Sequence, residues 1–245
     1  MLGRTHMAVG ALSAAVVVPM LLHHVDTHSM MFAFGAGVKP VEQLGLGIVA
    51  GTVGSMVPDM DQKDALLTRR VEWVGKLVVL CIAVVLIVLS GLAKSLEAWG
   101  IAAVLLAMVS RKEWMRKGSL VVMALIVMGF GVMYPEWFKP DVLITIWLVV
   151  TAFSAHRTFT HSLIGLILLS WAEMFIVIKL HQVWVGEIFI LGYVLHLFAD
   201  AIAGGVPLMW PYPKRFGVAL VKTAGMFDRM ISVLCVVLLI GVILG

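Results

Sequence analysis

Long apolar runs constrain this chain more than any other feature of its sequence. Of the 245 residues, 62% are hydrophobic and only 13% are charged. A soluble domain is nearer half apolar and a quarter charged. The pattern predicts an all-α, polytopic membrane bundle of about seven to nine helices, because a helical crossing takes about 20 residues. We expect one integral membrane domain over residues 1–245.

Nine apolar segments are expected to lie in the membrane, and several are shorter than a full crossing. They are Met7–Leu22, Leu44–Val57, Leu77–Ala93, Ala98–Val109, Ser119–Tyr134, Val142–Ala155, Ser162–Ile178, Val185–Ile202 and Met230–Leu244. The first run lacks a small-residue cleavage site, which indicates a retained helix rather than a signal peptide. Cys81 and Cys235 lie inside apolar runs and indicate no disulfide framework.

The basic residues predict an orientation. With a cytoplasmic N-terminus and alternating spans, 14 of the 18 Lys and Arg residues fall on the cytoplasmic side. Those on the outer side are Lys39, Lys94, Lys139 and Lys179. The net charge of +4 is therefore a topology signal, and no basic face with interleaved aromatic residues indicates a nucleic-acid partner. We expect a multi-pass protein of a bacterial or archaeal inner membrane.

The polar segment His156–His161 lies between two apolar runs and carries two imidazoles, a guanidinium and two hydroxyls. Ionisable residues at a membrane edge are costly and indicate a functional site. The alternative is a polar loop that joins two helices. The same topology brings the other polar motifs to the cytoplasmic side, namely Gly3–His6, Pro58–Asp61 and Asp200, with His196 one helical turn deeper.

Several of these side chains are candidate metal ligands. His196 and Asp200 are four residues apart and share a helical face, where they either ligate a metal or pair for packing. Two neighbouring carboxylates at a membrane edge repel each other unless a cation lies between them, although helix capping is the alternative. The expected ligands are His6, Asp59, Asp61, His156, His161, His196 and Asp200. This set suits one to three divalent ions, with Zn²⁺ expected and Mn²⁺ or Mg²⁺ as alternatives.

A His/Asp set without cysteine is typical of catalytic metal sites, which keep a position open for water. His156 and His161 lie about 140° apart around an ideal helix, so the segment turns or the two residues have separate roles. We expect His161 to be a ligand and His156 to be a second-metal ligand or a general acid or base. The predicted catalytic residues are His156, Arg157 and His161.

Basic and aromatic residues near these motifs are candidate substrate contacts. Arg157 is suited to bidentate binding of phosphate, and membrane anchoring is its other interpretation. Lys214 and Arg215 are expected to meet anionic headgroups. The predicted substrate-binding residues are Arg4, Arg157, Trp210, Lys214 and Arg215.

These motifs, taken together and in order, resemble the YdjM-like family of inner-membrane proteins, which are described as metal-dependent hydrolases. The motifs are Gly3-Arg4-Thr5-His6, Pro58-Asp59-Met60-Asp61, His156-Arg157-x-x-Thr160-His161-Ser162, and His196-x-x-x-Asp200 with Pro207 and Trp210-Pro211 after it. The resemblance implies a distant relation to zinc-dependent phospholipase C and P1 nuclease, where a His-x-x-x-Asp helix supplies metal ligands. Those enzymes often place a further His after the Pro, where this chain has Trp210, and use their N-terminal residue as a ligand.

Three functions compete at this point. The first is a membrane-embedded metal-dependent hydrolase, a phosphoesterase acting on a phospholipid or a lipid-linked phosphate at the cytoplasmic face. The second is an ion- or proton-coupled transporter that uses the His/Asp cluster. Transporter sites lie near the membrane midplane, often between repeats, whereas this polar set gathers at one edge and no repeat is evident. The third is a structural protein with a metal staple. The pattern favours the enzyme, with the oligomeric state open.

Overall fold

In the computed structural model, the described residues are 1–24, 40–61 and 112–244, together with scattered residues between 80 and 103. They form an all-helical fold, as predicted, whose only strand-like contact within these ranges is an isolated bridge between Val206 and Phe216. The seven α-helices named there are α1 (Gly3–His24), α3 (Pro40–Met56), α6 (Lys112–Met133), α7 (Phe138–Phe153), α8 (Leu163–Leu180), α9 (Val183–Ala203) and α10 (Met226–Leu244). The 3-10 turns named there are η1 (Val57–Asp61), η3 (Pro135–Trp137) and η4 (Phe159–His161).

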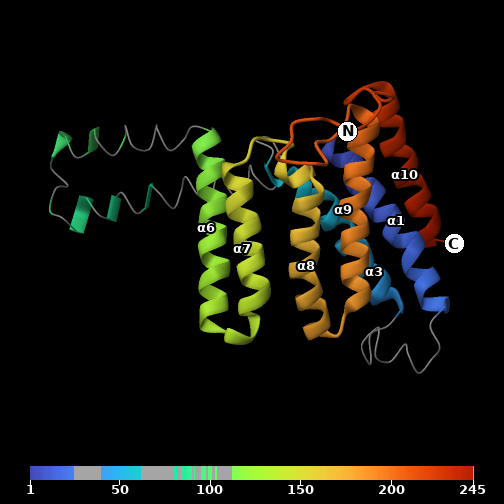
Figure 1. The fold of residues 1–245 in the computed structure, drawn as a ribbon, viewed down its shortest axis with the longest axis horizontal. Coiled ribbons are helices and arrows are strands. Elements are labelled where there is room, and N and C mark those ends of the chain that lie inside the picture. Colours follow the sequence, from blue (N-terminus) through green and yellow to red (C-terminus); the bar gives the residue numbers. More distant parts are fainter. Residues whose placement is uncertain are drawn as a thin grey trace.

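The helices stand side by side, and consecutive helices run in opposite directions (Figure 1). The α6–α7 pair forms one side of the bundle and packs through α7 on α8. Helices α1, α3 and α9 pack on one another at the other side, where α10 lies against α1. The polar turns η1 and η4 both lie at the end where the chain begins.

Glycines allow α1, α3 and α9 to approach closely. A Cβ atom at Gly54 would lie 1.9 Å from the carbonyl oxygen of Phe189, and one at Gly192 would lie 2.3 Å from that of Gly51. A Cβ atom at Gly10 would lie 2.4 Å from the same Gly51 oxygen. Small residues allow this backbone contact between membrane helices. The crossing matters for the site because His6, η1 and His196 each lie within a turn or two of one of these glycines.

The larger apolar core lies beneath η4, on the side of α7 and α8. Phe159 and Trp147 pack with ring centroids 6.1 Å apart, and both are buried. The Trp147 indole donates to the carbonyl oxygen of Gly165 at 3.0 Å. The buried hydroxyl of Tyr193 donates to the carbonyl oxygen of Thr160. This core therefore supports the backbone of the polar segment from below.

Five of the described helices are long and apolar enough to cross a membrane, namely α1, α6, α8, α9 and α10. Helices α3 and α7 are shorter, with 17 and 16 residues. The expected segments Leu77–Ala93 and Ala98–Val109 lie largely outside the described residues. The total of seven to nine spans and the orientation therefore stay predictions.

Candidate metal centre

Four separate elements bring buried His and Asp side chains to one point at this end of the bundle. His6 comes from the first turns of α1, Asp59 from η1 and His161 from η4. His196 and Asp200 come from α9, where the four-residue spacing places both on one helical face, as predicted. All five are buried, three of them with about 1% or less of their surface exposed. Five of the seven predicted ligands are thus brought together.

The nitrogens and oxygens of this group face one another. The Nε2 atoms of His161 and His196 lie 3.2 Å apart. Asp59 Oδ1 lies 3.8 Å from each of these two nitrogens. Asp200 Oδ2 lies 3.4 Å from His161 Nε2 and 3.8 Å from His196 Nε2. Four potential ligand atoms from three elements thus surround one small volume.

Hydrogen bonds on the far side of each ring set the tautomers. His196 Nδ1 lies 2.7 Å from the carbonyl oxygen of Ser55. A carbonyl only accepts, so Nδ1 carries the proton and Nε2 presents its lone pair. His161 Nδ1 lies 3.0 Å from the Thr160 hydroxyl, which itself donates to Asp61. With the Thr160 proton on Asp61, the hydroxyl oxygen accepts from His161 Nδ1, and in that arrangement His161 also presents an Nε2 lone pair, as metal-ligating imidazoles do.

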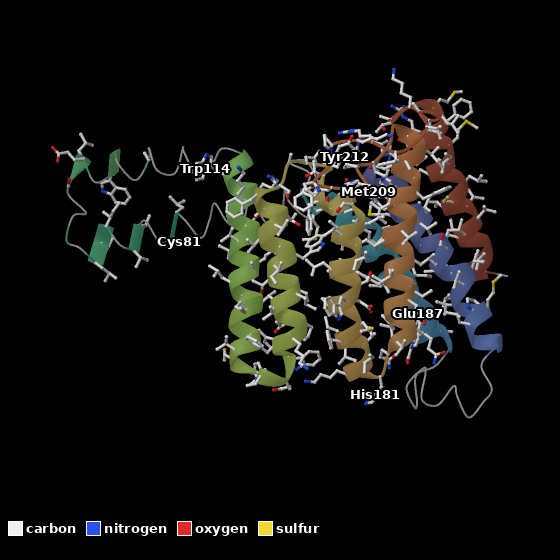
Figure 2. All side chains as sticks on the ribbon, viewed as in Figure 1. Cys81, Trp114, His181, Glu187, Met209 and Tyr212 are labelled. Carbon is white, nitrogen blue, oxygen red and sulfur yellow. The ribbon has the colours of Figure 1, made fainter. Side chains whose placement is uncertain are left out.

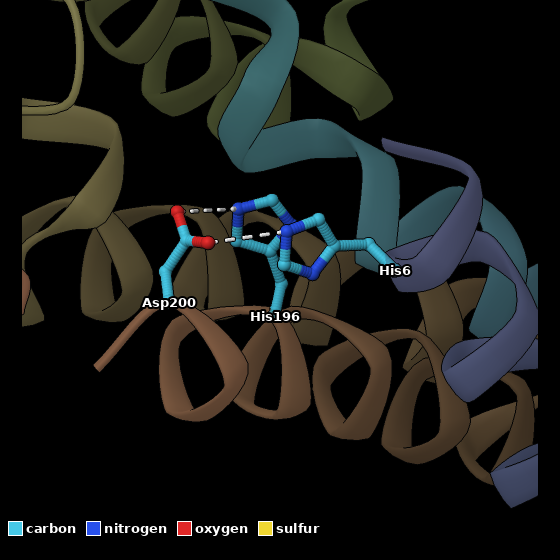
Figure 3. A group of neighbouring side chains, drawn as sticks. All are labelled: His6, His196 and Asp200. Atoms are coloured by element: carbon cyan, nitrogen blue, oxygen red, sulfur yellow. Dashed lines mark ion pairs between the residues drawn. The ribbon is translucent and has the colours of Figure 1, made fainter. Parts of the chain in front are cut away.

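His6 joins the group from the other side of Asp200. Its ring stacks on that of His196 with centroids 3.7 Å apart (Figure 3). Its Nε2 atom lies 3.2 Å from Asp200 Oδ1 (Figure 3). The amino group of Met1 contacts the same oxygen. The two oxygens of Asp200 therefore face different partners, with Oδ1 toward α1 and Oδ2 toward His161 and His196.

The electrostatics of the group are compatible with a bound cation. Burial raises the pKa of Asp59, while the neighbouring His161 pulls it down. Among the described residues, buried Asp59 Oδ1 and Asp200 Oδ2 accept no hydrogen bond, although the Arg157 guanidinium lies 3.3 Å from Asp200 Oδ2. Buried polar atoms are normally hydrogen-bonded, and each one left unpaired is destabilising. Two imidazole lone pairs 3.2 Å apart repel unless a positive charge lies between them. A divalent metal fits this donor set.

The remaining residues of the polar segment form an adjoining group. His156 Nδ1 donates to Asp61 Oδ1 at 2.8 Å, and the backbone N–H of Arg157 donates to Asp61 Oδ2 at 2.9 Å. Arg157 has φ of 56°, in the left-handed region that favours glycine. Its guanidinium Nη2 lies 3.3 Å from Asp200 Oδ2. Asp61 and His156 therefore lie beside the convergent atoms rather than among them.

A family model now places the chain among known proteins. The model of the YdjM inner membrane protein family matches residues 1–244. The chain belongs to this family. No curated protein and no solved structure matches it. The family description gives a membrane location and names no activity, so the chemistry of this YdjM-family chain rests on its own residues.

The predicted substrate-binding residues occupy different places in this family member. Arg157 lies at the metal group, with its side chain 29% exposed. Trp210 is half-buried and packs edge-on against Phe159 with centroids 5.2 Å apart, so it supports η4. Arg4, Lys214 and Arg215 are exposed. Lys214 Nζ lies 5.6 Å from the centre of the Phe216 ring, and no contact with the convergent atoms is described for these basic residues.

Two supporting residues had no predicted role. Asp228, at the start of α10, is fully buried and accepts hydrogen bonds from the Leu2 N–H at 3.0 Å and the Thr5 hydroxyl at 2.7 Å. It therefore holds the first turn of α1, from which His6 projects. Arg116 on α6 is buried and donates to the carbonyl oxygens of Thr151 and Ala152 where α7 ends. From the sequence alone, Asp228 could have been noticed as an acidic residue at the edge of the last apolar run.

Proposed function

We propose that this chain is a membrane-embedded, metal-dependent hydrolase that cleaves a phosphoester. The observation that carries the proposal is the convergence of His161, His196, Asp59 and Asp200 in a buried volume, with both imidazole lone pairs turned inward. Cysteine-free sets of this kind are typical of catalytic rather than structural zinc sites. Three imidazoles favour Zn²⁺ or Mn²⁺ over Mg²⁺, which prefers oxygen ligands.

The two oxygens of Asp200 divide the centre into two positions. Asp59 Oδ1, His161 Nε2, His196 Nε2 and Asp200 Oδ2 would hold one ion. His6 Nε2 and Asp200 Oδ1 would hold a second, in place of the contact that the Met1 ammonium makes with Oδ1. His196 serves only one of them, because its Nδ1 atom is bound to Ser55. The second position has fewer protein ligands in the described structure, which suits substrate and water.

The chain contributes binding and proton transfer around this centre. Divalent metal ions supply Lewis acidity that activates water and stabilises charge on a phosphoryl oxygen. Arg157 extends from a backbone fixed by Asp61 and directs its guanidinium to the edge of the group, where it can bind an anionic oxygen with two N–H donors. His156 keeps its Nε2 atom free for a proton, since its Nδ1 atom is held by Asp61.

A lipid is the proposed source of the phosphoester. The connection from α9 to α10, residues 204–225, carries Lys214, Arg215 and Lys222 and no acidic residue. It begins four residues after Asp200 and lies at the same end of the bundle as the centre, where Figure 2 labels Met209 and Tyr212. Tyr212 is 62% exposed and Leu220 is 74% exposed. Exposed apolar and basic side chains together are typical of contact with anionic headgroups.

The test is release of phosphate or of a phosphorylated headgroup from mixed phospholipids and polyprenyl phosphates in detergent. Wild-type protein loaded with Zn²⁺ or Mn²⁺ is expected to release product, and a chelator is expected to stop it. His196→Ala serves as the matched inactive protein. If the metal-loaded wild type releases no product from any of these lipids, the proposed phosphoesterase activity is contradicted. Measurement of metal flux in proteoliposomes would then test the alternative, a transporter.

A further inference from the structure

Asp61 lies two residues from Asp59 but faces a different set of partners. It is buried, with 1% of its surface exposed, at the end of η1. Its Oδ1 atom accepts from His156 Nδ1 at 2.8 Å. Its Oδ2 atom accepts from the Arg157 N–H at 2.9 Å and from the Thr160 hydroxyl at 3.2 Å. Three donors from the polar segment therefore occupy this one carboxylate.

The contact with Thr160 extends from Asp61 to the metal group. The Thr160 hydroxyl donates its hydrogen bond to Asp61, so its oxygen can accept a hydrogen bond from His161 Nδ1, 3.0 Å away. His161 then offers its Nε2 lone pair toward His196 and Asp200. An outer carboxylate that fixes a ligating imidazole through hydrogen bonds is a common support of metal sites.

The contact with His156 instead involves a side chain that is partly exposed to solvent. His156 is half-exposed, with 37% of its side chain accessible, whereas His161 is fully buried. The carboxylate holds the Nδ1 proton of His156 and leaves its Nε2 atom facing away from Asp61. The same carboxylate holds the N–H of Arg157, whose φ of 56° turns the chain between the two histidines.

We propose that Asp61 is a positioning residue that assigns separate roles to the two histidines of this segment. Through Thr160 it makes His161 a metal ligand, and directly it makes His156 an outward-facing imidazole with a free Nε2 atom. Asp61 itself holds no metal. The inference rests on the proposed metal centre. It replaces the expectation that Asp61 is a ligand, and of the two roles predicted for His156 it takes the general acid or base.

The variant Asp61→Asn separates the effect of Asp61 on His156 from its effect on His161, because an amide has one accepting and one donating end. Keeping the amide oxygen at the place of Oδ2 preserves the bonds from Arg157 and Thr160. The NH₂ group then faces His156 Nδ1, which must accept and so carries its proton on Nε2. Asp61→Asn is therefore expected to keep metal affinity within a few-fold and to reverse the tautomer of His156.

Changes at Thr160 test the link from Asp61 to His161. Thr160→Val removes the hydroxyl while keeping the shape of the side chain, so it releases His161 Nδ1. Loss of such an outer partner typically lowers metal affinity about 10–100-fold, and Thr160→Ser is expected to restore it. Thr158→Val is the matched control, because the exposed Thr158 hydroxyl bonds only to the Ala155 carbonyl oxygen among the contacts described. Asp59→Asn is the comparison for true ligand loss.

The experiment combines two measurements on the full chain in detergent. Competition titration with Zn²⁺ and a fluorescent chelator gives metal affinity and stoichiometry, and ¹⁵N spectra of histidine-labelled protein give the tautomers, with His156→Asn assigning the His156 signal. Loss of the ion in Asp61→Asn, as in Asp59→Asn, overturns the proposal by making Asp61 a ligand. Unchanged affinity in Thr160→Val overturns it as well.

A wild type that binds no metal contradicts the proposed function, and the ¹⁵N arm then decides the inference alone. An Nε2-protonated His156 in Asp61→Asn, against Nδ1-protonated in the wild type, supports positioning. The same tautomer in both proteins contradicts it. Turnover enters neither measurement, so failure of the hydrolase and failure of the positioning role remain distinct.

Discussion

The two ends of the helix bundle carry similar residue types and use them differently. At the far end from the centre, His181 caps α8 with its backbone at φ of 55°, and Lys179 lies 4.2 Å from the centre of the Trp137 ring. Figure 2 shows His181 at that end. At the site end, His161 and His196 turn their lone pairs toward each other and toward two carboxylates.

The difference is one of convergence rather than composition. Each ionisable residue named at the far end is accommodated separately, by a helix terminus or by a ring. At the site end several buried nitrogen and oxygen atoms face one another, an arrangement that the proposed cation would stabilise. Among the described residues, the groups of His and acidic side chains close enough to share a metal all lie at the site end. Buried acids without a hydrogen-bond partner also occur elsewhere, at Asp141 and Glu173, so the convergence of several ligand atoms on one point is what distinguishes the site end.

The largest expected effect comes from removing a convergent imidazole. His196→Ala and His161→Ala should each abolish binding of the first ion, with a loss greater than the ~10–100-fold typical of outer partners. Metal content of the purified protein measures it. His181→Ala at the far end is the control and should keep wild-type metal content. Equal metal content in all three variants would remove the difference between the two ends.

The glycine crossing that builds the site end should be the next most sensitive feature. Gly54→Ala places a Cβ atom against the Phe189 backbone, and overpacking of this kind costs about 1–3 kcal/mol. Gly45→Ala on the same helix is the control, because a Cβ atom there meets no atom within 4 Å. Thermal unfolding of both variants in detergent compares them. If Gly54→Ala is as stable as Gly45→Ala, helices α3 and α9 are not tightly packed at Gly54.

Local spacing explains which parts of the centre could be predicted from the sequence. His196 and Asp200 share a face by helix geometry alone, and the apolar flanks mark the His156–His161 segment as unusual. The all-α fold follows from the same apolar runs. These features depend on neighbours in sequence, so no tertiary contact is needed to find them.

The divided roles of Asp59 and Asp61 could not be predicted in this way. Both follow Pro58 and both are buried, and only the course of η1 against η4 sends one to the histidine pair and the other to His156. Asp228 was missed for the same reason, since its partners Leu2 and Thr5 lie more than 220 residues away. Long-range backbone placement decides such roles.

Arg157→Lys should have a smaller effect that is confined to turnover. A lysine keeps the charge but replaces a forked donor with a point charge, so the expected fall in kcat/KM is about tenfold, or ~1.4 kcal/mol. Metal content should stay at the wild-type value, because Arg157 contacts Asp200 without being a metal ligand. Steady-state kinetics on the released headgroup gives the result. Equal kcat/KM would leave Arg157 as a membrane anchor.

The smallest effect is expected at the exposed basic residues of the α9–α10 connection. Lys214→Gln with Arg215→Gln removes two positive charges from a surface that holds no acidic residue between 204 and 225. A basic residue at the surface of an anionic bilayer contributes up to about 1 kcal/mol and less with distance from it, so these two exposed side chains together contribute about 1 kcal/mol. The double variant should therefore raise KM several-fold in nanodiscs rich in phosphatidylglycerol and leave it unchanged in zwitterionic ones, with kcat constant in both. High salt should erase the difference, since the Debye length falls from about 10 Å at 0.1 M to about 3 Å at 1 M. Lys139→Gln, an exposed lysine at the far end, is the matched control and should change KM in neither lipid. A double variant that loses activity equally in both lipids would show that these residues act on the centre itself and not on the surrounding lipid.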